Sequence, residues 1–250
     1  MPRTIIAGNW KMHKTAAQAV AFFDAFLPHL ATLPPEVEIV VAPPFTSIPA
    51  AALQLRGTRV HLGAQTMHWA LEGPFTGEVS APMLREFGVT HVILGHSERR
   101  ALFGETDRTV NLKLRTALEQ QLTPIVAVGE TLAERDAGAT DARVLEQTRA
   151  ALEGVSPVEF RNIVIAYEPI WSIGTGKNCE PTEANRVMET IRASLDGLDS
   201  TSILYGGSMT AANVVAYMAQ PNINGGLVGG ASLDPDGFAA IIAKAELLEL

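Results

Sequence analysis

Five short polar segments in this 250-residue sequence carry groups that could do chemistry together. Each directly follows a short apolar run: Asn9-Trp10-Lys11, Gly95-His96-Ser97-Glu98-Arg99, Tyr167-Glu168-Pro169, Gly206-Gly207-Ser208 and Gly229-Gly230-Ala231-Ser232. A carboxylate such as Glu168 can take a proton from a carbon next to a carbonyl, and an imidazole such as His96 can polarise that carbonyl. A base paired with an electrophile indicates enolisation chemistry.

The glycine pairs and Lys11 add an anion site beside Glu168 and His96. Glycines let backbone N–H groups approach an anion, and the segment after each pair can begin a helix whose dipole favours negative charge. Lys11 adds a full positive charge, so local donors can hold a small dianion although the net charge of the chain is −8. Together these groups predict enolisation of a small phosphorylated aldehyde or ketone.

Taken singly, each of these signals has an ordinary structural explanation. A lone lysine after a strand is more often a solvated charge, a lone histidine is more often a hydrogen-bonded structural residue, and Gly-Gly pairs occur in tight turns. What favours chemistry is the position that the segments share, which depends on the fold.

The elements that must position these segments alternate between strands and helices. The candidate strands are Thr4–Gly8, Glu38–Ala42, Val60–Ala64, His91–Leu94, Pro124–Gly129, Asn162–Tyr167, Ser202–Tyr205 and Gly226–Val228. Several are nearly continuous apolar runs, which is typical of parallel strands covered on both faces. Between them, Pro181–Asp196 has apolar residues at helical spacing, and Asp234-Pro235 is a good helix start.

Eight strand–helix units in about 250 residues predict an α/β fold, a (β/α)₈ barrel with eight parallel strands and an outer ring of helices. We expect one domain over residues 1–250. A doubly wound open sheet shares the alternation, but it needs G-x-G-x-x-G after an early strand, and Gly8-Asn9-Trp10-Lys11 does not match. In a barrel the active site is built at the carboxyl ends of the strands, so all five polar segments fall on one rim.

The segment after Glu168 has the composition of a hinged lid. It consists of Pro169, Ile170, Trp171, Ser172, Ile173, Gly174, Thr175, Gly176 and Lys177. Proline stiffens one end, Gly-Thr-Gly gives flexibility at the other, and a bulky apolar tip lies between. A lid would exclude water from an enediolate that otherwise loses phosphate. A nucleotide P-loop is excluded because Asn178 stands where that motif needs Ser or Thr.

The connection after the third strand, Gln65–Gly77, is long and has no helical period. Loops of this length inside compact domains are usually functional or interfacial. Its aromatic residues Trp69 and Phe75 indicate a partner surface if they are exposed. The alternative is a loop folded back on its own barrel.

Composition excludes several classes of protein. The chain is 47% hydrophobic and 18% charged, and its 19 Lys+Arg against 27 Asp+Glu argue against a general nucleic-acid binder. No run approaches the roughly 18 apolar residues of a membrane span, and Gly8 and Asn9 interrupt any leader-like stretch at the N-terminus. The one cysteine, Cys179, permits no intramolecular disulfide and suits a reducing compartment. We therefore expect a cytoplasmic location and a buried, inert thiol.

The sequence closely resembles the triosephosphate isomerase family over essentially its whole length. The segments that carry the resemblance are GNWKMH (8–13), GAQ (63–65), FTGEVSAPML (75–84), LGHSERR (94–100), VGE (128–130), AYEPIWSIGTGK (166–177), YGGSM (205–209) and LVGGASL (227–233). They occur in the family's order. Any one could arise by chance, but eight together could hardly do so.

The resemblance implies roles for these residues. Glu168 would be the base that moves a proton between C1 and C2 of dihydroxyacetone phosphate and glyceraldehyde 3-phosphate in glycolysis and gluconeogenesis. His96 would be the electrophile, as a neutral imidazole. Asn9 and Lys11 would bind and polarise the substrate, with Glu98 as the partner of Lys11. The phosphate donors would be Gly174, Ser208, Gly229 and Gly230, together with Asn9 and Lys11. No cofactor or metal is implied.

The resemblance also implies a homodimer. The long loop after the third strand would insert into the neighbouring subunit and bring Thr76 towards the neighbour's Asn9, Lys11 and His96. Phe75 and Gln65 would belong to the same interface.

Three other functions are less well supported. A Schiff-base aldolase would need a buried lysine inside the barrel, typically on the sixth strand, but the chain has five lysines and that strand ends at Glu168. A barrel kept as a binding protein should have lost Lys11, His96 or Glu168 first. A metal-dependent isomerase finds no support in the linear sequence, because the six histidines show no ligand spacing such as H-x-H.

Overall fold

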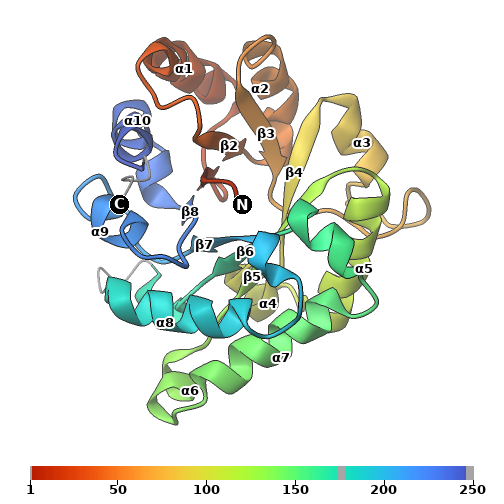
Figure 1. Cartoon of the computed structure of the whole chain (residues 1–250). Helices are drawn as coiled ribbons and strands as arrows, with labels where there is room; N and C mark the ends of the chain where they lie inside the picture. The colour runs from red at the N-terminus through yellow and green to blue at the C-terminus, as the bar shows by residue number, and fades with distance from the viewer. Residues whose placement is uncertain (1, 174–177, 246–250) are drawn as a thin grey trace.

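The computed structural model describes residues 2–173 and 178–245, and Figure 1 shows helices arranged around a central barrel. Within these residues eight parallel strands close in chain order, with β8 beside β1. They are β1 (Ile5–Asn9), β2 (Glu38–Ala42), β3 (Val60–Ala64), β4 (Val89–Leu94), β5 (Thr123–Val128), β6 (Val164–Tyr167), β7 (Ser202–Tyr205) and β8 (Gly225–Val228). The predicted (β/α)₈ barrel is confirmed, and each strand boundary lies within two residues of its predicted position.

The α-helices surround the strands (Figure 1). In the described residues they are α1 (Ala16–Phe26), α2 (Ile48–Gln54), α3 (Ala81–Glu86), α4 (Ser97–Leu102), α5 (Asp107–Glu119), α6 (Leu132–Asp136), α7 (Thr140–Leu152), α8 (Pro181–Arg192), α9 (Val214–Met218) and α10 (Pro235–Ala243). Among these same residues, no helix has the length and apolar composition that crossing a membrane requires.

Two helices test the sequence-based expectations. Helix α10 begins as predicted, because the Asp234 carboxylate accepts a hydrogen bond from the Gly237 N–H at 2.7 Å. Helix α8 begins at Pro181 but ends at Arg192, four residues before the predicted end. The chain turns back after Arg192 through Gly197, whose φ of 99° is the left-handed conformation that glycine adopts most easily, and then enters β7.

Two apolar cores hold the barrel together. One lies between the strands and the helices, and the other fills the barrel interior. The interior core consists of Ile5, Ala7, Val40, Ala42, Ile93, Ile125, Val164, Ala166, Leu204 and Leu227. Because side chains alternate along a strand, the next inward positions after these apolar residues are Asn9, Glu168, Gly206 and Gly229. The alternation that fills the core therefore also aims the polar segments into the carboxyl end of the barrel.

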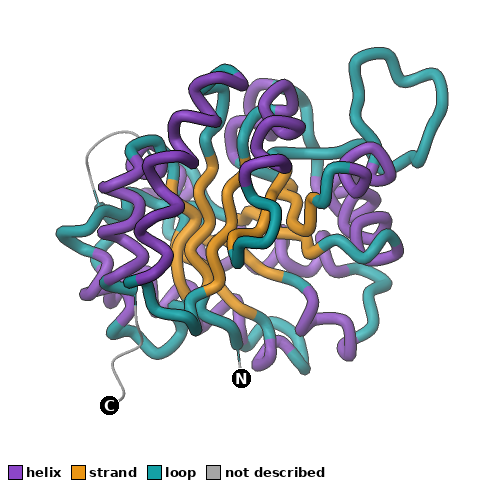
Figure 2. The backbone as a smooth tube through the Cα atoms, turned by 90° about the horizontal axis from the view of Figure 1, so that it is seen from above, coloured by secondary structure: helices purple, strands orange, loops and turns teal. Residues whose placement is uncertain are grey.

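The long loop after β3 projects from the barrel at the upper right of Figure 2. Residues 71–78 are exposed, so the tip of the loop does not fold back on the barrel. At its base the buried His68 ring lies between two aromatic rings, with centroids 4.1 Å from Trp69 and 4.0 Å from Phe75. The loop therefore holds its own shape by ring stacking while its tip faces outward.

Candidate active site

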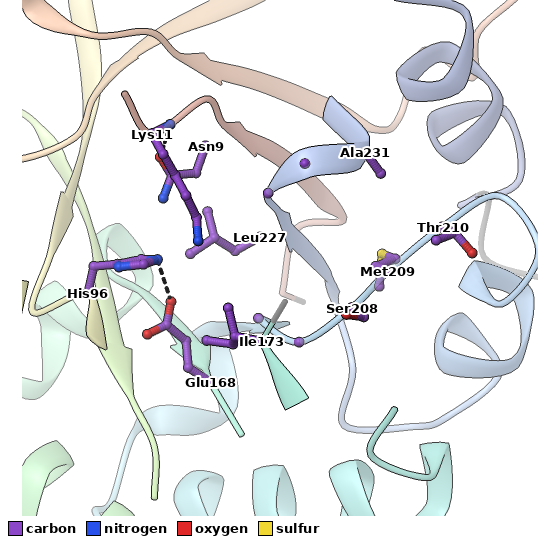
Figure 3. Close-up of a pocket in the computed structure, with 14 residues that line it drawn as sticks. Asn9, Lys11, His96, Glu168, Ile173, Ser208, Met209, Thr210, Leu227 and Ala231 are labelled. Carbon is purple, nitrogen blue, oxygen red and sulfur yellow. Dashed lines mark hydrogen bonds and ion pairs between the residues drawn. The ribbon is translucent and has the colours of Figure 1, made fainter. Parts of the chain in front are cut away.

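A cavity of about 260 Å³ opens at the carboxyl end of the barrel (Figure 3). Its lining comes from all five polar segments and from the start of the predicted lid: Asn9, Lys11, His96, Glu168, Ile173, Gly206, Gly207, Ser208, Met209, Thr210, Leu227, Gly229, Gly230 and Ala231. Sites for drug-sized ligands span about 300–1,000 Å³, so this cavity suits a smaller molecule.

Glu168 and His96 face each other across one side of the cavity (Figure 3). The Glu168 Oε1 atom lies 3.1 Å from His96 Nε2, and the other oxygen accepts a hydrogen bond from the Ser97 backbone N–H at 2.9 Å. Both side chains are buried. A carboxylate and an imidazole are thus held in contact at the wall of a small cavity.

The hydrogen bonds of His96 identify its tautomer. His96 is the N-cap of α4, and its Nδ1 accepts the backbone N–H of Glu98 at 3.2 Å. The Glu98 Oε2 atom lies farther from Nδ1, at 3.7 Å, which is too long for a hydrogen bond. Since Nδ1 acts as an acceptor, the ring proton is on Nε2. Nε2 is the ring nitrogen that faces Glu168.

Lys11 lies at the end of β1 with its ammonium group in the cavity. Its Nζ is 2.5 Å from Glu98 Oε1, so the pairing of these residues is observed. The backbone of Lys11 has a φ of 53°, which is uncommon for a residue with a side chain, and its N–H donates to Asn9 Oδ1 at 3.0 Å. Backbone strain of this kind persists only where neighbouring groups enforce it.

Gln65 is one of those neighbouring groups. Its Nε2 donates to the carbonyl oxygen of Lys11 at 2.7 Å and to that of Ala42 at 3.0 Å. The sequence assigned Gln65 only to an interface, and its contact with the strained turn was missed. The available signal was its place directly after a strand, which it shares with the five polar segments.

Glycines also line the cavity and permit close approach. A Cβ atom at Gly206 would lie 2.8 Å from the Glu168 Cγ atom, which is closer than such atoms come. A Cβ atom at Gly229 would lie 3.6 Å from the Lys11 Cε atom, so the lysine reaches the loop after β8. Gly230 begins a 3₁₀ turn, Gly230–Ser232. Of the predicted phosphate donors, Ser208, Gly229 and Gly230 thus line the cavity, whereas Gly174 lies outside the described residues.

The predicted lid is described from Pro169 to Ile173, and it includes the 3₁₀ turn Ile170–Ser172. Ile173 lines the cavity, and the Ser208 hydroxyl donates to the Ser172 carbonyl at 3.3 Å. Gly174, Thr175, Gly176 and Lys177, which were predicted to complete the lid, are outside the described residues.

Glu130 fixes the start of this segment, and the sequence had given it no role. Its Oε1 accepts hydrogen bonds from Trp171 Nε1 at 2.8 Å and from the Tyr167 hydroxyl at 3.1 Å. The Arg135 guanidinium lies 4.4 Å from the centroid of the Trp171 ring. Burial raises the pKa of Glu130 above its usual value.

A second cavity shares Asn9, Lys11 and His96 with the first, and apolar side chains line its outer part. Two of these are widely exposed: Met12 at 93% and Phe103 at 67%. Thr76, on the projecting loop, is exposed as well. Exposed apolar groups beside a functional cavity are typical of a surface that binds another molecule.

Comparisons with known proteins give one family. A family model described as triosephosphate isomerase matches residues 4–245. The curated protein named triosephosphate isomerase from Acaryochloris marina is 52% identical over 242 residues, which cover 97% of this chain and 99% of that protein. The protein of the same name from Symbiobacterium thermophilum is 52% identical over 251 residues, covering 98% of each chain. The one from Nostoc punctiforme is 51% identical, covering 97% and 98%.

Proposed function

The chain belongs to the triosephosphate isomerase family, and on that premise we propose that it interconverts dihydroxyacetone phosphate and D-glyceraldehyde 3-phosphate in glycolysis and gluconeogenesis. The observation that carries the proposal is the buried Glu168 carboxylate, 3.1 Å from His96 Nε2 in a small cavity lined by glycine loops. The proposal takes residues 1–250 as one catalytic domain that works without a cofactor.

Glu168 is the base of the proposed reaction. Its carboxylate takes the proton from C1 of dihydroxyacetone phosphate and returns it to C2, which converts the ketone into the aldehyde through an enediolate. The His96 Nε2–H donates a hydrogen bond to the substrate carbonyl and moves a proton between the two oxygens. The Ser97 N–H donates to Glu168 and His96 Nε2 lies 3.1 Å from its other oxygen, so in the proposed reaction His96 turns from this contact to the substrate.

The phosphate is bound on the opposite wall. Backbone N–H groups after β7 and β8, together with the Ser208 hydroxyl, supply donors that need no protein charge. Lys11 supplies a positive charge between this wall and the reacting carbons, since it reaches Gly229 while it pairs with Glu98. These groups stabilise the negative charge of the enediolate as it develops. Asn9, which accepts the Lys11 backbone N–H, binds the substrate beside it.

The segment Pro169–Lys177 acts as a lid in this proposal. Closing it over the cavity excludes water, which protects the enediolate from losing phosphate. Glu130 supports that role by fixing the Trp171 indole at the start of the segment.

We also propose a homodimer. In it, the loop that carries Phe75 and Thr76 enters the second cavity of the neighbouring subunit. The exposed Met12 and Phe103 side chains and the outward direction of the loop favour this arrangement. It brings Thr76 towards the neighbour's Asn9, Lys11 and His96.

The proposal is tested by the rate at which the purified chain converts glyceraldehyde 3-phosphate. Glu168→Gln removes the base but keeps the size of the side chain, so we expect kcat to fall by about 10²–10⁴-fold. Glu153→Gln, the same change at an exposed glutamate after α7, is the matched control and should keep full activity. If all three proteins, prepared identically, had equally slow rates, the activity would be contamination and the proposal would fail.

A further inference from the structure

A polar layer fills the barrel at its amino end, opposite the substrate cavity. Glu38 begins β2, His61 is the second residue of β3, and His91 is the third residue of β4. Arg3 precedes β1. Neither the sequence-based roles nor the proposed reaction uses any of these four residues.

The strand alternation points these side chains into the barrel. Glu38 and His91 each lie two residues before an interior core residue, Val40 and Ile93. Gly63 also faces the interior, because a Cβ atom there would lie 3.1 Å from the interior side chains of Val40 and Ala42. His61 lies two residues before Gly63 and therefore points the same way. The layer is therefore the polar base of the interior core.

Glu38 brings the two imidazoles together. Its Oε1 atom lies 2.9 Å from His91 Nε2 and 4.0 Å from His61 Nε2, and the three atoms all lie within 4.8 Å of one another. The other carboxylate oxygen pairs with the Arg3 guanidinium at 2.8 Å. One oxygen and two ring nitrogens thus converge on a single point, while Arg3 holds the carboxylate from outside.

Thr90 sets the orientation of the His91 ring. Its hydroxyl lies 2.8 Å from His91 Nδ1 and 3.4 Å from His61 Nδ1. Histidines that bind metals almost always use their other ring nitrogen in such a contact, which fixes the tautomer and leaves the ligand nitrogen bare. In both rings the nitrogen left to bind a metal is Nε2, which faces Glu38.

His91 Nε2 is buried against Glu38 Oε1. The side chain is 3% exposed, and among residues 2–173 and 178–245 this nitrogen makes no hydrogen bond of acceptable geometry, although Glu38 Oε1 is 2.9 Å away. With Thr90 on Nδ1, a bare Nε2 and Glu38 Oε1 would be two acceptors at this distance, so either a proton or a metal cation must lie between them.

We propose that Glu38, His61 and His91 form a binding site for a divalent first-row transition-metal ion, with Zn²⁺ the best match to the ligands. Zinc sites with an open position use three protein ligands of this kind, at about 2.0–2.2 Å, so tetrahedral ligand atoms lie roughly 3.3 Å apart. The observed separations of 2.9 and 4.0 Å lie on either side of that value. His61, which is half-exposed, needs only a small shift.

The fourth position faces solvent. His61, whose side chain is 42% exposed, and Thr90 line a groove between α2 and α3, so the His61 side of the site is open to solvent. The site joins the beginnings of β2, β3 and β4, and the apolar interior core separates it from the substrate cavity. The ion would therefore stabilise the barrel and take no part in the reaction.

Direct metal binding tests this proposal. The untagged chain, freed of metal with a chelator, is titrated with Co²⁺, whose visible absorption reports the coordination geometry, and with Zn²⁺ by calorimetry. We expect one ion per chain with tetrahedral or five-coordinate absorption. His61→Gln should weaken binding by more than about 100-fold, which exceeds the effect of losing an outer partner. Thr90→Val, which removes such a partner, should weaken it about 10–100-fold.

Matched variants distinguish this site from other histidines. His29→Gln changes an exposed histidine paired with Asp236 and should bind the metal normally. His96→Gln should also bind normally. Binding that survives in His61→Gln, or is lost in His96→Gln, would overturn the proposal, as would a wild-type chain that binds neither ion.

Thermal unfolding gives a second readout that does not depend on enzyme activity. Zn²⁺ at 100 times its Kd should raise the apparent Tm of the wild type and of His29→Gln by roughly 5–10 °C. It should leave that of His61→Gln unchanged. The Tm of His61→Gln without metal shows whether this variant folds normally, and equal Zn²⁺ shifts in all three proteins would contradict the site.

Discussion

At the scale of single residues, the start of α4 sets the hydrogen bonding of both proposed catalytic groups. The first backbone N–H groups of a helix have no partner inside the helix. Here the Ser97 N–H donates to Glu168 and the Glu98 N–H donates to His96. One helix end thus donates to both side chains that the proposed reaction uses.

Gln65 provides a residue-scale prediction, because its amide donates to two backbone carbonyls at the strained Lys11 turn. Gln65→Glu replaces that donor with a carboxylate that faces both oxygens. We expect the free energy of unfolding to fall by about 1–3 kcal/mol, the cost of leaving partly buried polar groups unpaired, and the KM to rise as Lys11 shifts.

Urea unfolding and steady-state kinetics measure both effects. The control is Gln18→Glu, since the Gln18 side chain accepts the Thr15 N–H in a capping box that glutamate also serves. Equal stability of these two variants would show that Gln65 does not hold the turn.

Cys179 gives a prediction that depends on pH. Its thiol is buried, as the sequence led us to expect, and burial raises its pKa to about 12. At pH 8 only about 10⁻⁴ of the Cys179 thiol is ionised, whereas roughly a quarter of an exposed cysteine is. A disulfide reagent should therefore react with Cys179 in the native chain about three orders of magnitude more slowly than with an exposed cysteine. This rate should rise about tenfold per pH unit. A native rate close to that of the urea-unfolded chain at pH 8 would contradict the burial argument.

The raised pKa of Cys179 also makes the stability of the fold depend on pH. Because the folded pKa lies above the unfolded one, the contribution of the thiol to stability is complete below about pH 8.5. It is lost as the pH rises towards 12.

At the scale of secondary-structure elements, the strands could be predicted because each is a short apolar run that meets a polar segment. Alternation along those runs then placed Asn9 and Glu168 in the cavity. Contacts between segments far apart in the chain could not be predicted in this way. Three examples are the contact of Gln65 with Lys11, the contact of Glu130 with Trp171, and the polar layer around Glu38. They depend on which strands become neighbours and on the side-chain rotamers inside the barrel. No local pattern carries that information.

Glu130 links two elements and yields a prediction at this scale. Its Oε1 is the acceptor for Trp171 and Tyr167, and burial raises its pKa. Glu130→Gln keeps an acceptor oxygen in place, whereas Glu130→Met removes the acceptor that the two donors share.

We expect the methionine variant to lose about 1–3 kcal/mol more stability than the glutamine variant. Its kcat should also be lower, because the start of the lid is no longer fixed. Trp171 fluorescence, unfolding in urea and kcat provide the comparison. Indistinguishable variants would mean that packing alone positions Trp171.

At the scale of the whole molecule, the barrel separates two polar ends with one apolar core. The carboxyl end has the glycine loops and the Glu168–His96 pair, and the amino end has the layer around Glu38. Interior side chains from seven of the strands lie between them. The two ends share no residue, and substitutions at separated sites without shared partners usually have additive effects, so each end can be altered on its own. This separation is why metal binding and isomerisation can be tested independently.

The last prediction concerns the proposed homodimer, for which Met12 is the sharpest probe. In the single chain its side chain is 93% exposed beside the substrate cavity. If the chain worked as a monomer, Met12→Lys would be a surface change within about 0.5 kcal/mol. If the neighbour's loop covers Met12, the substitution places an unpaired charge in an interface, and burying such a charge is strongly unfavourable. We therefore expect Met12→Lys to sediment as a monomer at micromolar concentration with reduced kcat.

Val158→Lys is the matched control, because this valine is 72% exposed and precedes β6 at the amino end, away from the proposed interface. It should sediment as the wild type does and keep its activity. Sedimentation velocity over a range of concentrations separates a weakened dimer from an unfolded chain, since dilution dissociates only the former. Were Met12→Lys and Val158→Lys both to sediment as dimers, the subunits would meet through another face, and Thr76 would not reach the neighbouring site.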